Sequence, residues 1–93
     1  MTDLNITMTI NGEAVSGPET FDVENPATGK AFAKAPDCTQ AQLDAAVAAA
    51  RAALPAWKAT PIAKRREALN AMAGVIMQNL PELSRLLTRE QGK

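Results

Sequence analysis

Residues 30–54, KAFAKAPDCTQAQLDAAVAAARAAL, contain the point at which the sequence changes from a strand pattern to a helix pattern. The change falls at Pro36. After it, Thr39 and Gln42 have the T-x-x-Q spacing of a pair that caps the start of a helix. One apolar face of that helix then recurs at helical spacing, with Leu43, Val47, Ala50 and Leu54. The sequence therefore predicts strands before Pro36 and helices after it.

The first of two predicted β-hairpins lies near the start of the chain. Apolar and polar residues alternate over residues 6–10, which is the period of a half-buried strand. Asn11-Gly12 follows, and it is the strongest short hairpin signal because both residues accept a positive φ. Residues 13–15 are predicted to be the returning strand.

The second predicted hairpin is centred on residues 25–29, NPATG. In this tight turn Pro26 fixes φ at the first corner, and Gly29 can adopt a left-handed conformation. Residues 30–35 are predicted to pair back onto the preceding strand. Phe32 is their one bulky anchor.

Two or three helices are predicted after Pro36. The first is expected to end at Pro55, and Thr60-Pro61 is expected to open the next, with a capping threonine and a proline at the first helical position. Pro81 interrupts the second helical pattern, and a mid-helix proline costs about 3 kcal/mol. We therefore expect a break near Asn79-Leu80. A last short helix is predicted to turn three leucines inward, Leu83, Leu86 and Leu87.

Composition bounds what the chain can do. Its 93 residues suffice for one small domain, and the ten basic and ten acidic residues leave no net charge. A basic surplus for binding nucleic acid is missing, and nothing indicates a membrane partner. Much of the 46% hydrophobic content is alanine, and only three residues are aromatic. Because an independent core would be marginal, we expect a segment that packs on something else.

The cysteine count and the first residues bear on the compartment. A single cysteine, Cys38, allows no intramolecular disulfide, which agrees with a reducing environment. Residues 1–5 lack the basic region and apolar run of a signal peptide. We therefore expect a cytoplasmic protein.

Residues that could carry chemistry were weighed against plainer roles. The sequence has no histidine, so Cys38 lacks a base and is interpreted as a cysteine at a helix boundary rather than a nucleophile. Arg65 and Arg66, with Lys64, could bind an anion, but a solvated helix face is the favoured interpretation. Trp57 could stack on a ligand, and we expect instead that it fills the corner between two helices.

Four stretches, in their order, resemble the opening of the aldehyde dehydrogenase superfamily. They read INGE at 10–13, FDVENPATGK at 21–30, LDAAVAAARAA at 43–53 and LTREQGK at 87–93. Trp57 stands where the family has a tryptophan. Three positions depart from the family pattern, Ala14, Pro81 and Gln91. The resemblance implies an α+β fragment of a larger α/β fold, with N-terminal β-hairpins followed by two or three α-helices.

The family relationship also implies an activity for the complete protein. Members oxidise aldehydes to carboxylic acids with a cysteine thiolate, a glutamate and NAD or NADP. By resemblance, all of these residues lie beyond Lys93. No catalytic and no cofactor-binding residue is therefore assigned here, the role of the thiolate is not carried over to Cys38, and neither nucleotide is expected to bind this fragment.

The resemblance further implies part of a monovalent-cation site. Many members hold sodium or potassium with main-chain oxygens before the "N-P" and with an acidic residue before the final "G-K". The matching positions are Val23, Glu24 and Glu90, and hard cations prefer oxygen ligands of this kind. At least one family ligand lies beyond Lys93, so the set is incomplete. The alternative for Glu90 is a surface carboxylate.

Two functions from different classes follow. The first is the N-terminal structural portion of an NAD(P)-dependent aldehyde dehydrogenase, inactive by itself. Residues 1–35 would form its hairpin region and residues 36–93 a helical segment that packs on the nucleotide-binding domain. Its partners would be the rest of that chain and further copies in a homo-oligomer. The second is a free-standing helical module for protein interaction or self-association.

Overall fold

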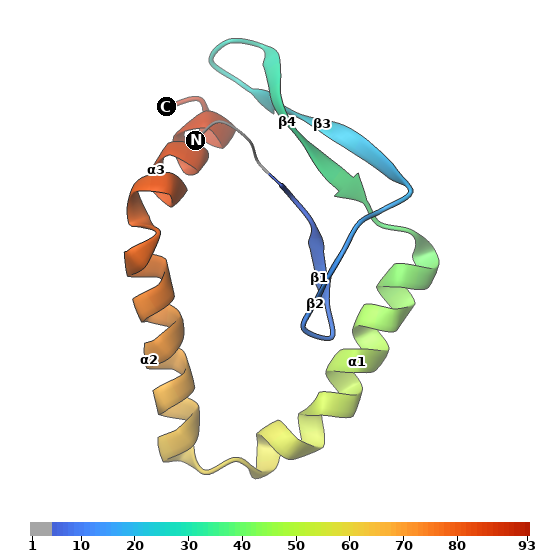
Figure 1. The fold of residues 1–93 in the computed structure, drawn as a ribbon, viewed down its shortest axis with the longest axis vertical. Helices are drawn as coiled ribbons and strands as arrows, with labels where there is room; N and C mark the ends of the chain where they lie inside the picture. The colour runs from blue at the N-terminus through green and yellow to red at the C-terminus, as the bar shows by residue number, and fades with distance from the viewer. Residues whose placement is uncertain (1–4) are drawn as a thin grey trace.

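The computed structural model describes residues 5–93, so part of the stretch used for the signal-peptide expectation, residues 1–4, lies outside it. Two antiparallel hairpins precede three helices, which confirms the predicted α+β class (Figure 1). The strands and helices are β1 (Met8–Ile10), β2 (Glu13–Val15), β3 (Glu19–Asn25), β4 (Lys30–Asp37), α1 (Gln40–Ala59), α2 (Ile62–Gln78) and α3 (Leu80–Gln91).

The first hairpin turns where its sequence predicts. Ile10 pairs with Glu13, so the loop contains only Asn11 and Gly12. Their φ angles are 53° and 77°. Two successive positive φ values match the twist of the flanking strands, which is why this pair of residues favours a two-residue hairpin.

The NPATG turn is stabilised by hydrogen bonds among its own residues. The side-chain oxygen of Asn25 accepts a hydrogen bond from Ala27 N at 2.9 Å, and the Asn25 carbonyl accepts one from Gly29 N at 2.8 Å. Gly29 has a φ of 71°, as predicted. Asn25 then pairs with Lys30, which starts the return strand.

The return strand is longer and less regular than predicted. It runs to Asp37, past the expected end at Ala35, because both strands of a two-stranded sheet are edge strands and an edge tolerates Pro36. Val23 pairs with Ala33 while Glu24 pairs with Ala31. Phe32 is therefore the extra residue of a bulge, and its side chain is half-buried.

Helix α1 starts as predicted and ends later. Thr39 accepts a hydrogen bond from Gln42 N at 3.1 Å, and the Gln42 side chain accepts one from Thr39 N at 3.0 Å. The prediction that Pro55 ends the helix is wrong, since α1 continues to Ala59. Proline removes one helical donor and crowds the preceding turn, and a helix can accommodate this by bending. The axis of α1 turns in its last part, near the bottom of Figure 1.

The junctions around α2 differ in detail from the prediction. Thr60 does not start α2, because its hydroxyl donates to Ala56 O at 2.8 Å at the end of α1. Pro61 precedes the first helical residue of α2 and its carbonyl accepts from Lys64 N. The predicted break before Pro81 is confirmed. α2 ends before Asn79, and Pro81 lies in the first turn of α3, where its missing N–H costs nothing.

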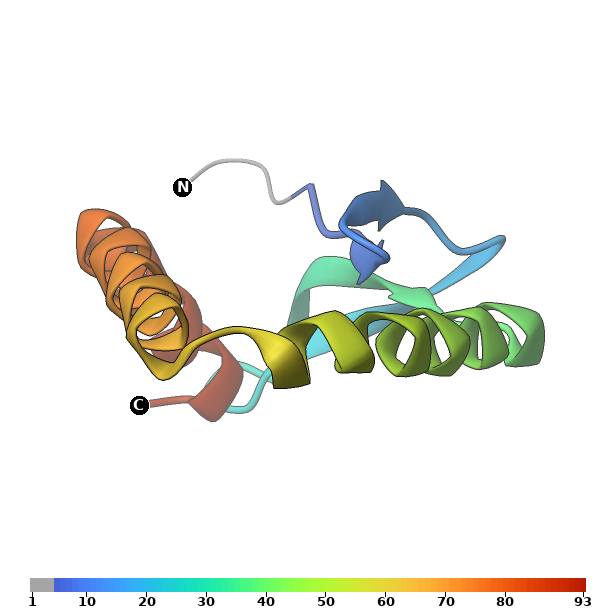
Figure 2. The same cartoon turned by 90° about the horizontal axis from the view of Figure 1, so that it is seen from below.

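Residues 5–93 contain no buried residue and hence no hydrophobic core of their own. The molecule measures 47 × 33 × 18 Å, with a radius of gyration of 16.6 Å where a compact chain of this length has about 12 Å. Its accessible surface of 7406 Å² compares with about 5,200 Å² for a compact protein of equal mass. The helices and hairpins form an open frame rather than a packed domain (Figures 1 and 2).

The first hairpin rests on the alanine side of α1 rather than on its predicted apolar face, whereas the second hairpin contacts α3. Ala46 and Ala49 are half-buried near the tip of the first hairpin, and Gln42 donates to Ser16 O at 3.1 Å. Alanine allows this close approach because its side chain is small. The predicted stripe remains exposed, including Leu43, Val47 and Leu54.

Within residues 5–93 no helix has both the length and the apolar content needed to cross a membrane.

Candidate functional site

The NPATG turn and the end of the chain lie against each other. Helix α3 contacts β3 and ends at Gly92, whose φ is 74°. Gly92 N donates to Thr88 O at 2.8 Å, which closes the helix with a left-handed residue. A Cβ on Gly92 would lie 2.9 Å from Ala27 N and 3.1 Å from Pro26 Cβ. Two motifs from opposite ends of the sequence therefore meet in one close contact, which only glycine permits.

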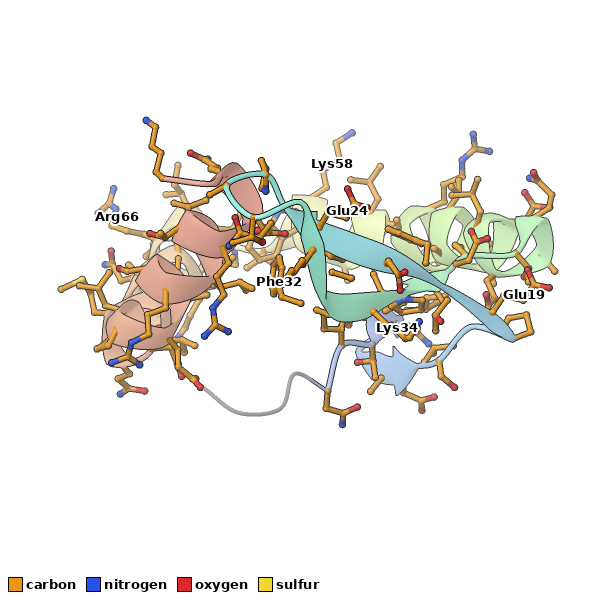
Figure 3. All side chains as sticks on the ribbon, turned by 90° about the horizontal axis from the view of Figure 1, so that it is seen from above. Glu19, Glu24, Phe32, Lys34, Lys58 and Arg66 are labelled. Carbon is orange, nitrogen blue, oxygen red and sulfur yellow. The ribbon has the colours of Figure 1, made fainter. Side chains whose placement is uncertain are left out.

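This contact brings together the elements that carry the predicted cation ligands. Val23 is half-buried on β3, and Glu90 is exposed in the last turn of α3. Glu24 is exposed on the same strand as Val23 (Figure 3). Among residues 5–93 no three acidic, cysteine or histidine side chains cluster in a way that could hold a metal ion. The cation site rests on main-chain oxygens as well as carboxylates, so it stays a prediction.

A second feature lies at the corner between α1 and α2. A groove of about 450 Å³ opens there, with an almost wholly apolar surface apart from two guanidinium groups. The residues that line it are Trp57, Ile62, Arg65, Arg66 and Leu69. Trp57 lies at the helix corner as expected. It is 46% exposed, so residues 5–93 leave much of its surface uncovered.

The basic cluster divides between solvent and this groove. Lys64 forms an exposed ion pair with Glu67 at 3.3 Å, and Arg66 is also exposed (Figure 3). The predicted solvated face is confirmed for Lys64, and Arg66 is exposed at the rim of the groove. Arg65 departs from it, because the side chain is half-buried and its Nε is buried with no hydrogen-bond partner among residues 5–93.

Arg65 was missed as a groove residue, although its spacing contained the signal. Ile62, Arg65 and Leu69 are three and four residues apart, so they share one face of α2. A basic residue within an apolar stripe has to lie beside apolar neighbours. The prediction treated Lys64, Arg65 and Arg66 as one solvated face because they are consecutive charges. It therefore overlooked the helical spacing that Arg65 shares with the apolar residues of α2.

The remaining polar groups are ordinary surface features. Cys38 is exposed just before α1, and its thiol lies 3.4 Å from Thr39 O. Lys34 and Asp22 form an ion pair at 2.8 Å between β4 and β3, with both side chains more than half exposed. An exposed pair of this kind contributes little to stability. Neither feature combines a nucleophile with a base.

Comparison with known proteins identifies the family. Residues 13–93 match the family model described as "Aldehyde dehydrogenase family". The chain belongs to this family. The resemblance found in the sequence is thereby confirmed, and the matched range covers both the NPATG turn and the Gly92 contact.

Individual aldehyde dehydrogenases show the same relationship. The chain is 44% identical over 73 residues to rat mitochondrial methylmalonate-semialdehyde/malonate-semialdehyde dehydrogenase [acylating], covering 78% of this chain and 14% of that protein. It is 44% identical over 85 residues to malonate-semialdehyde dehydrogenase of Pseudomonas aeruginosa, covering 90% of this chain and 17% of that protein. The chain thus spans about a sixth of the length of these relatives.

Proposed function

We propose that this chain is the N-terminal structural portion of an NAD(P)-dependent aldehyde dehydrogenase and that it is catalytically inactive by itself. One observation supports this most strongly. The chain belongs to the aldehyde dehydrogenase family, yet no residue between 5 and 93 is buried. Apolar surface exposed on this scale normally marks an interface. The frame would be completed by the rest of an aldehyde dehydrogenase.

The proposed role is to build the fold around a catalytic body. Helices α1 and α2 would pack their exposed apolar faces on the nucleotide-binding domain, and residues 1–35 would form a separate hairpin region. NAD or NADP would bind elsewhere, because the five glycines of the chain lie at scattered positions and form no G-x-G-x-x-G loop. Partners would be the remaining chain and further copies in a homo-oligomer.

The names of the relatives favour a substrate class. Mammalian and bacterial proteins of 40–44% identity are named for malonate semialdehyde. We propose that the complete enzyme oxidises a short aldehyde of this kind to a carboxylic acid, with hydride passing to NAD(P)+ and water supplying the oxygen, whereas the mammalian relatives are named as acylating enzymes. We propose a cytoplasmic location, although the names of the mammalian relatives state a mitochondrial one for those proteins.

A chimera tests the proposal. In the Pseudomonas aeruginosa relative, the 85 matched residues are replaced by the corresponding residues of this chain. We expect a folded enzyme that forms NAD(P)H from malonate semialdehyde, because this chain presents the surfaces that the body needs.

The matched control carries a flexible Gly-Ser linker of the same length, which spans the gap without packing. It should be inactive. Equal activity of the linker control, or a chimera that fails to fold, would overturn the proposal.

A further inference from the structure

The groove at the α1–α2 corner combines apolar surface with uncompensated positive charge. Trp57, Ile62 and Leu69 are 46%, 68% and 60% exposed, so a partner that covers the groove would bury substantial apolar area. Each square ångström of such area contributes about 25 cal/mol when it leaves water. The groove is therefore a favourable docking surface.

Any partner that covers these apolar residues also covers Arg65. Its Nε is already withdrawn from water without a hydrogen-bond partner among residues 5–93. Removing the rest of a guanidinium from water is costly unless an opposite charge and hydrogen-bond acceptors replace the water. Apolar contact alone would therefore leave an unpaired buried charge.

Residues 5–93 do not supply the opposite charge at the groove. No acidic residue lines the groove in the part of the chain that the structure describes. Glu67, close by on α2, already pairs with Lys64. Arg66 adds a second guanidinium at the same rim. A carboxylate is the natural complement, because its two oxygens match the paired donors of a guanidinium.

We propose that this groove receives a segment of the aldehyde dehydrogenase body that carries a carboxylate between apolar side chains. The carboxylate pairs with Arg65, and the apolar side chains cover Trp57 and Leu69. The proposal rests on the proposed function, since that body is the partner. It adds the chemistry of one contact and makes Arg65 a residue that positions the helical segment.

The chimera provides the test, read out as the rate constant of thermal inactivation. Arg65→Met keeps the stem of the side chain and removes the charge, so we expect the rate constant to rise roughly a hundredfold to a thousandfold, as for a buried pair that loses one partner. Arg65→Lys keeps the charge and should recover part of the loss. Arg85→Met changes an exposed arginine of α3, away from the groove and on the opposite face from Leu83 and Leu87, and should stay within about twofold.

A chemical footprint covers the case in which Arg65→Met prevents folding. In the unaltered chimera, Arg65 should resist phenylglyoxal while Arg85 reacts, whereas both should react in the isolated chain. Equal inactivation rates for Arg65→Met and Arg85→Met, or free reaction of Arg65 in the active chimera, would overturn this inference and leave the proposed function standing. A chimera that never folds would overturn both.

Discussion

The isolated 93-residue chain should melt without a cooperative thermal transition. Its surface exceeds that of a compact protein of equal mass by about 2,200 Å². If a little over half of that excess is apolar, the burial it forgoes is of the order of 30 kcal/mol. Net stabilities of folded domains are only about 5–15 kcal/mol. The frame in Figure 1 therefore depends on surface supplied from outside.

Far-ultraviolet circular dichroism during heating measures this directly, with light scattering to report the mass of the species. A gradual loss of helical signal by the monomer is the expected result. The alternative of a free-standing interaction module predicts a sharp transition by an oligomer of defined size. A sharp, concentration-independent transition of a monomer would contradict both.

Replacing Gly92 by alanine should have a far larger effect than the same change at Gly12 or Gly29, the other two glycines with a positive φ. Its φ of 74° costs a residue with a side chain about 1–2 kcal/mol. The new Cβ would also lie 2.9 Å from Ala27 N, and overpacking of this kind adds about 1–3 kcal/mol. Because the backbone cost and the packing cost add, the chimera that carries Gly92→Ala should lose activity faster on heating.

Gly29 is the matched control for that substitution. It has nearly the same φ, 71°, but a Cβ there meets no atom within 4 Å. Gly29→Ala therefore carries the backbone cost without the packing cost, and its inactivation rate should rise roughly tenfold less than that of Gly92→Ala. Equal rates for the two variants would show that the contact between α3 and the NPATG turn contributes nothing.

Local signals predicted the hairpins and helix boundaries that depend on local chemistry. The Asn11-Gly12 turn is set by two positive φ angles, and the NPATG turn and the Thr39–Gln42 cap close hydrogen bonds within a few residues, so the sequence contains their cause. The prediction that α1 ends at Pro55 failed because a proline ends a helix only where the helix cannot bend around it. Thr60 was assigned to the wrong helix because it lies between two helices and either one can use its hydroxyl.

Long-range features were not predictable in the same way. Periodicity identified the apolar stripe of α1 but not which side the first hairpin would use, since the alanine side packs more closely on it. Nothing in the sequence pattern alone places Gly92 against Pro26, because that contact depends on how α3 lies on β3. The groove around Arg65 likewise depends on the angle between α1 and α2.

The most direct test of the central claim is an assay for NAD(P)H formation by the purified 93-residue chain, supplied with malonate semialdehyde and either NAD+ or NADP+. We predict a signal equal to the enzyme-free blank, beside clear turnover by the chimera in the same assay. Aldehyde-dependent reduction of the nucleotide by the 93-residue chain alone would contradict the account.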